Sequence, residues 1–174
     1  MKEINKSFQD YWVNEAKAIK WLKIPKRALD IKNRKLQWYK DGKINIFDAC
    51  IEKNLSQNRN KICINFYDKN RALHQYSYKE ISDYVKSLSF HLKKCSKEKK
   101  IKSLLIYGSA SIETTISMLA CSQLGIHFSV IFQDLSFEAV MLRAQLLKSN
   151  FIISRCIDNN FYNELFKTKN FNSK

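Results

Sequence analysis

Glycine and proline are scarce: the 174 residues contain three glycines and one proline. The three glycines do not form the GxxxxGK[ST] or GxGxxG patterns with which glycine-rich loops hold phosphate groups. No apolar run approaches the roughly 18 residues that cross a bilayer. The polar start, MKEINKSFQD, also lacks the pattern of a signal peptide. We therefore expect a cytoplasmic protein with no membrane partner.

Metal-binding and nucleophile motifs are absent as well. None of the five cysteines belongs to a CxxC pair, and the three histidines lack ligand spacing. We therefore expect no metal site and no disulfide framework, but reduced thiols, with His91 and His127 packed in a helix and a strand. The run from Gly108 to Ser111 falls short of the GxSxG nucleophile elbow, and no carboxylate pair suggests acid–base chemistry. No catalytic residue is predicted.

The chain is strongly basic, with a net charge of +15 from 31 basic and 16 acidic residues. Only six of the basic residues are arginines, and the lysines are scattered apart from the run at 93–100. No recognition-helix or arginine–aromatic pattern accompanies them, so we expect no nucleic-acid partner. The lysine-rich residues 95–100 are predicted to form a solvated loop.

The first third of the chain reads as a helical extension. Apolar residues at helical spacing predict an amphipathic helix over 7–21, and Pro25 ends that segment. Residues 28–35 are predicted to be loop and 56–60 a polar linker. Between them, Asn45 is expected to cap a short helix through about Leu55. The inward residues of that helix are predicted to be Phe47, Cys50, Ile51 and Leu55.

The remainder predicts an α/β arrangement. Residues 61–67 and 74–77 form a small hairpin, and Ser77-Tyr-Lys-Glu80 has the capping-box pattern of a helix that continues to about Lys94. Strands at 103–107, 126–132 and 151–154 alternate with helices that end at Gly125 and begin after Ser136. Short connections of this kind predict a βαβαβ three-layer unit with parallel strands. The division is 1–57 for the extension, 58–155 for the α/β domain and 156–174 for an irregular tail.

The turn at Gly108 has two interpretations. A strand that runs into a glycine at a helix N-terminus is a place for a phosphate, and Asp134 after the next strand is a partner for a ribose hydroxyl. Glu113 in the first helical turn would repel that phosphate. The alternative is a tight βα turn that the glycine permits, with Glu113 favourable toward the helix dipole.

Four stretches together resemble a known family. The first is YWVNEAKAIKWLKIPKRALD at 11–30, and the second is WYKDGKINIFDACIEKNL at 38–55. The third and fourth are YSYKEISDYVKSLSFHLK at 76–93 and IYGSASIETTISMLACSQLGIHFSVIFQDLSFEAVMLR at 106–143. In order and spacing they resemble the N-terminal portion of short-chain AMP-forming acyl-CoA synthetases, the acetyl-CoA and propionyl-CoA synthetases. The matching positions include Trp12, Trp21, Pro25, Gly42, Tyr107, Glu113, Ala120, Cys121, Gly125, Ser136 and Arg143.

The resemblance implies a partial adenylate-forming ligase domain. Full-length members use ATP, Mg and coenzyme A to activate a carboxylate, but their phosphate loop and catalytic lysine are not found in these residues. We therefore expect a truncated ligase that is inactive and binds no cofactor alone. The alternative is a binding or regulatory module that docks on a partner ligase.

Departures from the family pattern occur at Ser109, at Ile112 and at Gln133-Asp134, which replaces paired glycines. A missing remainder would leave apolar surface exposed. We therefore expect marginal stability, with self-association or the rest of a split ligase as partner.

Overall fold

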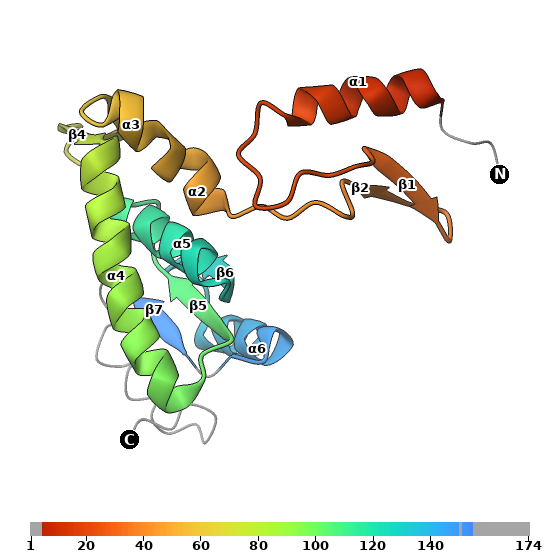
Figure 1. Cartoon of the computed structure of the whole chain (residues 1–174). Helices are drawn as coiled ribbons and strands as arrows, with labels where there is room; N and C mark the ends of the chain where they lie inside the picture. The colour runs from red at the N-terminus through yellow and green to blue at the C-terminus, as the bar shows by residue number, and fades with distance from the viewer. Residues whose placement is uncertain (1–4, 150, 155–174) are drawn as a thin grey trace. The chain divides into compact units, whose positions relative to one another are not determined.

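The structure is a computed structural model that describes residues 5–149 and 151–154. The chain divides into two compact units, Met1–Asn54 and Leu55–Lys174 (Figure 1). Within the described ranges, no helix combines the length and apolar character needed to cross a bilayer. The predicted tail at 156–174 lies outside the described residues.

The first unit begins with helix α1 (Lys6–Ala16), which Asn5 caps by accepting from the Ser7 backbone N–H. The predicted helix over 7–21 is therefore too long. Trp21 explains the early end, because its indole Nε1 donates to the Ala16 carbonyl at 2.7 Å. The same carbonyl also accepts from the Ile19 backbone N–H at 3.0 Å, so the helix closes in a tight last turn.

A β-hairpin follows where the sequence predicted loop at 28–35, so that prediction is wrong. Strand β1 (Leu29–Lys32) pairs antiparallel with β2 (Lys35–Trp38). The two connecting residues, Asn33 and Arg34, have φ of 53° and 60°. This is the left-handed two-residue turn that matches the twist of a hairpin, and asparagine tolerates it well.

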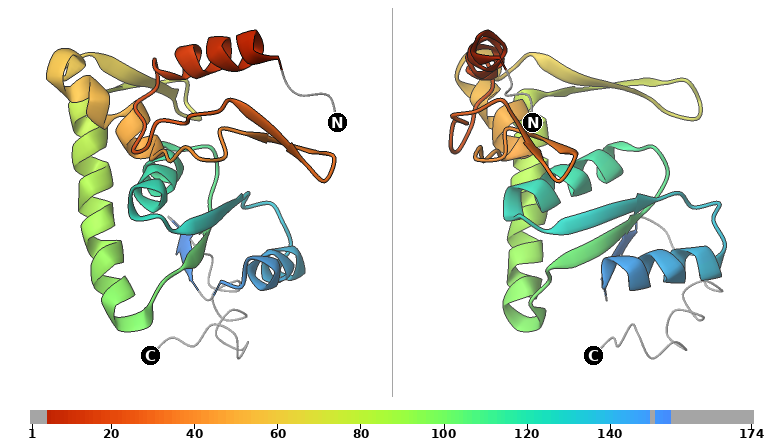
Figure 2. Two further views of the ribbon diagram at one scale, coloured as in Figure 1. Left: turned by 45° about the vertical axis from the view of Figure 1, so that its right-hand side comes forward. Right: turned by 90° about the vertical axis from the view of Figure 1, so that its right-hand side faces the viewer.

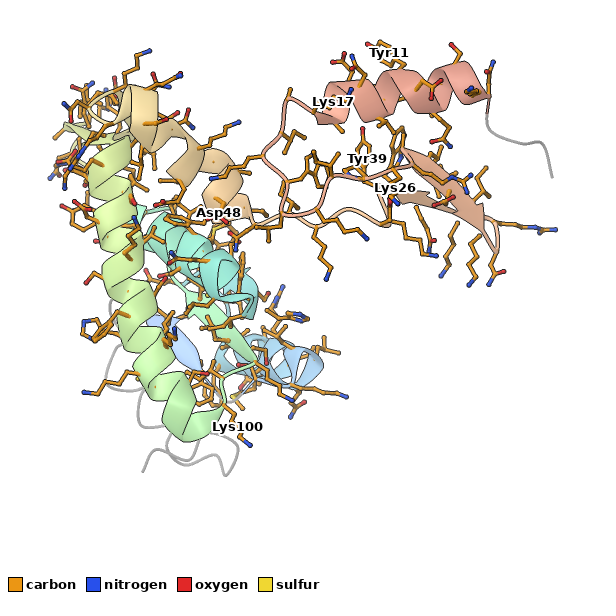
Figure 3. The ribbon with its side chains drawn as sticks, viewed as in Figure 1. Tyr11, Lys17, Lys26, Tyr39, Asp48 and Lys100 are labelled. Carbon is orange, nitrogen blue, oxygen red and sulfur yellow. The ribbon has the colours of Figure 1, made fainter. Side chains whose placement is uncertain are left out.

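The side chain of Gln9 ties α1 to this hairpin. Its oxygen accepts from the backbone N–H groups of Ala28 and Leu29, and its nitrogen donates to the Leu29 carbonyl. Across the unit, the Tyr39 hydroxyl donates to the Trp12 carbonyl at 2.9 Å. Figure 3 shows the Tyr39 side chain directed from the end of β2 toward α1. Side-chain hydrogen bonds thus hold the helix against the hairpin.

The short helix capped by Asn45 is confirmed, but it is broken into pieces. Helix α2 (Ile46–Cys50) is followed by the 3₁₀ turn η1 (Glu52–Asn54) and, at the start of the second unit, by α3 (Leu55–Asn58). Phe47 and Ile51 are buried as predicted, whereas Cys50 is exposed. The predicted linker at 56–60 is therefore partly helical.

In the second unit the predicted hairpin and capping box are both present. Strands β3 (Ile62–Tyr67) and β4 (Leu73–Ser77) pair antiparallel, and Ser77 with Glu80 caps helix α4 (Tyr78–Lys99). The helix runs through the residues predicted as a basic loop and ends at Lys100, whose φ is 50°. Lysine is a good helix former and is favoured near a C-terminus, so a charged run without glycine or proline does not stop a helix.

The central sheet has the predicted parallel strands. Strand β5 (Ser103–Tyr107) lies between β6 (His127–Ile131) and β7 (Ile152–Ser154) in the order β6-β5-β7. Helices α5 (Ile112–Leu124) and α6 (Phe137–Leu147) lie on opposite faces of the sheet (Figure 2). This placement follows from right-handed crossovers. The connection from β5 to β6 and the connection from β6 back to β7 run in opposite directions along the sheet, so their helices cover opposite faces.

The core of the unit lies between the sheet and its helices. On one face, a buried cluster joins the sheet to α6 and consists of Leu105, Tyr107, Ile131, Val140 and Ala144. On the other face α5 packs against α4, and its fully buried residues are Ser117, Ala120 and Cys121.

The predicted packing of His91 and His127 is wrong, since both side chains are exposed. His91 lies beside the buried face of α4, which carries Ser89 and Leu92. His127 is the first residue of β6, at the amino end of that strand. The His91 ring makes an edge contact with the exposed Phe90, at 5.6 Å between ring centroids, rather than packing in the core.

Candidate functional site

The topology singles out the carboxyl end of β5 as the place for a ligand. From β5 the chain passes over one face to β6, and it then returns over the other face to β7. In an open parallel sheet, such a reversal leaves a crevice beyond the carboxyl ends of the strands. A cavity of about 170 Å³ lies there, formed by the ends of β5 and β7, the start of α5 and the residue Gln133 after β6.

Hydroxyl groups dominate the lining of this cavity. Ser111 is the N-cap of α5, and its oxygen accepts from the Thr114 backbone N–H at 3.3 Å. Thr114 donates to the Ser109 carbonyl at 2.8 Å, and Ser117 donates to the Glu113 carbonyl at 2.8 Å. Ser111, Thr114 and Ser117 recur every three residues, and this spacing places them on one helix face. Sequence reasoning missed this hydroxyl repeat, which is legible as SxxTxxS.

Gly108 lies where a side chain would crowd Thr114 in the first turn of α5. It does not have positive φ, unlike Gly125, which ends α5 at φ 69° as predicted. A Cβ at Gly108 would lie 3.0 Å from the Thr114 Oγ1 atom, tighter than almost all such contacts. The glycine therefore lets the strand end approach the first turn of α5, and the sequence-based interpretation of a tight turn needs this refinement.

Two hydrogen bonds fix the loop that closes the other side of the cavity. The Gly108 backbone N–H donates to the Ile131 carbonyl at 3.0 Å. The hydroxyl of Tyr107, whose side chain is buried, donates to the Gln133 carbonyl at 2.8 Å. The segment with Gln133-Asp134 is thus held to β5 itself. Asp134 is exposed and is not part of the lining, so the structure does not bring the predicted ribose contact into the cavity.

The charge of the cavity does not suit a phosphate. Its described lining contains one carboxylate, Glu113, and neither lysine, arginine nor histidine. Ser111 already occupies one N–H of the helix terminus that would bind an anion. The residues present therefore do not fit the triphosphate of ATP by themselves. Over the described part of the chain, no group of three or more His, Cys, Asp or Glu side chains is arranged to hold a metal ion.

The buried thiol of helix α5 is a poor nucleophile. Cys121 of α5 is buried, and this burial raises the pKa of its thiol to about 11. A thiol that remains protonated near neutral pH is a poor nucleophile. The crevice accordingly offers hydroxyls, one amide and one carboxylate for hydrogen bonding, without the cation that charged substrates need.

Comparison with known proteins gives one consistent relationship in sequence and fold. No protein-family profile matches the chain. Acetyl-coenzyme A synthetase of Helicobacter pylori (strain G27) is 27% identical over 154 residues, which cover 87% of this chain and 23% of the relative. The enzyme of the same name from Streptomyces coelicolor is 27% identical over 146 residues, and that of Marinobacter nauticus is 29% identical over 150.

Among solved structures, acetoacetyl-CoA synthetase from Streptomyces lividans superposes with a TM-score of 0.76 at 14% identity. The superposition covers 91% of this chain and 26% of that one. The chain therefore spans about a quarter of the length of the relatives it matches. The α/β class predicted from the sequence and the resemblance to part of an acyl-CoA synthetase are both confirmed.

Proposed function

We infer that this chain, a partial acyl-CoA synthetase, supplies the N-terminal portion of an AMP-forming ligase for a short carboxylic acid and is inactive alone. The sequence relatives are acetyl-CoA synthetases, so acetate is the first substrate to test. The inference about inactivity is carried by the crevice at the carboxyl end of β5. It lies where the fold places a ligand, but its described lining provides no positive charge.

The proposal has a physical basis in the demands of adenylate formation. Displacement at a phosphate needs cations or a metal to balance charge that spreads over its oxygens. Ser111, Thr114 and Ser117 provide hydrogen bonds but no charge, and Glu113 adds a negative one. ATP, Mg²⁺ and coenzyme A would therefore need charged groups other than those of this crevice.

Acid-dependent exchange of pyrophosphate into ATP tests the inference directly. The purified chain is incubated with ATP, Mg²⁺ and acetate or propionate, and a full-length acetyl-CoA synthetase serves as the positive control. We expect no exchange above the rate without added acid. Acid-dependent exchange by the purified chain would refute the proposed inactivity.

A second candidate function is a docking module for the remaining part of a ligase or for a partner ligase. The observation that favours it is exposed apolar surface on the second unit, in a sheet whose outer described strands are β6 and β7. The large exposed side chains on this unit include Phe90, Phe132, Leu142 and Leu146. Docking would require that these side chains be covered together by the partner as one apolar patch.

The DNA next to the gene provides the partner for the test. A neighbouring reading frame that encodes a Ser/Thr/Gly-rich loop with a lysine, and the rest of a ligase, would be expressed and mixed with this chain. We expect one complex in size-exclusion chromatography and exchange activity that neither chain has alone. Separate elution at micromolar concentrations would reject docking, whatever the outcome of the exchange assay on the single chain.

A further inference from the structure

A second cavity lies at the opposite edge of the central sheet. It has a volume of about 660 Å³ and is formed where β5 and β6 begin and where α4, α5 and α6 end. This volume is within the range of about 300–1,000 Å³ that is usual for small-molecule sites. None of the residues used in the carboxyl-edge crevice contributes to it. Figure 3 shows Lys100 at the end of α4 that marks this edge.

The cavity joins an apolar floor to a basic rim. Its apolar lining consists of the buried Ile101 and Ile126 and the half-buried Leu124 and Leu147. Its charged lining consists of three exposed lysines, Lys93, Lys102 and Lys148, with the exposed His127 beside them. The described residues around the cavity include no carboxylate. The combination suits a ligand with an aliphatic body and an anionic end.

The helix ends determine how such a ligand would be oriented. Three helices present their C-termini at this edge, and a helix C-terminus carries a partial negative charge. A small, strongly hydrated anion such as phosphate is therefore disfavoured deep in the cavity. The lining lysines are exposed and have flexible stems, so an anionic group is favoured at the rim while the apolar body covers the floor.

We propose that this cavity binds an aliphatic carboxylate of medium chain length, with its chain on Ile101, Ile126 and Leu147 and its carboxylate beside Lys102 and Lys148. The site is independent of the proposed ligase function, because it lies at the other edge of the sheet. Acetate is too short to cover the apolar floor. Binding of acetate as a ligase substrate can therefore be told apart from binding of a longer carboxylate in this cavity.

Nuclear magnetic resonance of the whole ¹⁵N-labelled chain locates and measures the binding. Sodium octanoate is titrated below its micelle-forming concentration, with 1-octanol, acetate and inorganic phosphate as comparison probes. We expect octanoate to shift the amide signals around Ile101, Gly125 and Ile126. Affinity should fall about fourfold for each methylene removed, which is the loss expected for a buried methylene group. Octanol should bind more weakly, and acetate and phosphate should leave these signals unchanged.

Matched substitutions separate the site from general attraction to a basic protein. Lys102→Gln should weaken octanoate binding about threefold, the effect of losing one solvent-screened charge pair. Lys93→Gln is a second variant of the same kind. Lys69→Gln, in the turn between β3 and β4, removes the same charge away from the cavity and should leave the affinity unchanged. Equal weakening by Lys69→Gln, equal binding of octanol, or no shift at the cavity amides would each overturn the proposal.

Discussion

A single methyl group at Gly42 is a severe test of how the first unit is packed. A Cβ there would lie 2.8 Å from the Trp21 Cζ3 atom and 3.2 Å from the Tyr39 carbonyl oxygen. The indole is not free to move away, because its Nε1 is hydrogen-bonded to Ala16 and its ring packs on Tyr39 with centroids 5.4 Å apart. Gly42→Ala must therefore shift the ring that also ends helix α1.

The expected magnitude follows from two opposing effects. Overpacking by one methyl group destabilises a folded protein by about 1–3 kcal/mol. Alanine also restricts the unfolded chain, which stabilises by about 0.4–1 kcal/mol where the native backbone allows it. Gly42 does not have positive φ, so the backbone allows alanine. The free energy of unfolding of the first unit should fall by roughly 1–2 kcal/mol as the balance of these effects.

Tryptophan fluorescence during urea unfolding measures this change selectively, because all three tryptophans lie in the first unit. The decisive comparison is Gly42→Ala in a Trp21→Leu background, where the colliding ring atoms are gone and the penalty should become much smaller, with only the 3.2 Å approach to the Tyr39 carbonyl oxygen remaining. Gly125→Ala is the control for the assay: it lies in the second unit, so it should leave the transition reported by the tryptophans unchanged. Equal penalties for Gly42→Ala with and without Trp21 would refute the reasoning.

Three further predictions concern other parts of the chain. Arg34→Gly should stabilise the first unit by about 0.5–1 kcal/mol in the same urea assay, because glycine adopts the left-handed turn conformation without the penalty of a Cβ; an unchanged or lower midpoint would contradict this. Iodoacetamide at pH 8 should modify the exposed Cys50 and Cys95 but spare Cys121 until the chain unfolds, as mass spectrometry of the peptides would record. Hydrogen bonds from the Ser77 backbone and side chain lower the pKa of the Glu80 carboxyl from its ordinary value of 4.5. The contribution of Glu80 to stability is therefore fully present above about pH 4.5 and is lost as the pH falls through the lowered pKa. Unfolding followed from pH 6 to 3 should therefore show a shallower acid loss for Glu80→Gln than for the unmodified chain, and identical slopes would count against the capping carboxylate.

The second unit was predictable because its signals are local and agree with one another. The capping box at Ser77 and Glu80, the left-handed end at Gly125 and the cap at Ser136 each fix one helix boundary without reference to distant residues. Short apolar runs between them leave a parallel sheet as the consistent solution. Errors arose where a boundary depends on tertiary contacts. Helix α1 ends at Ala16, whose carbonyl accepts from the Ile19 backbone and from the Trp21 indole, and periodicity does not reveal these bonds.

The hairpin at Asn33 and Arg34 was missed for a different reason. A two-residue turn is recognised most readily by glycine, and this chain has almost none to mark it. The candidate site was only partly predictable as well. Gly108 and the strand ends were recognised, whereas the hydroxyl lining depends on which face of α5 meets the sheet end. On its packed side, this helix buries the small residues Ser117, Ala120 and Cys121.

The distribution of charge within the second unit argues against independent nucleotide chemistry. Three lysines surround the cavity at the amino edge of the sheet, while the cavity at the carboxyl edge contains only the carboxylate of Glu113 as a charged group among its described residues. A phosphate site in an open parallel sheet belongs at the carboxyl edge, where helix N-termini point. Among the described residues, the basic side chains are therefore not arranged to bind a nucleotide there. If this chain takes part in adenylate formation, the positive charge must come from another segment that closes over Ser111 and Thr114. Lysine introduced by Glu113→Lys would then be expected to create weak ATP binding in the isolated chain, whereas an unchanged calorimetric titration would mean that crevice shape, rather than charge, excludes the nucleotide.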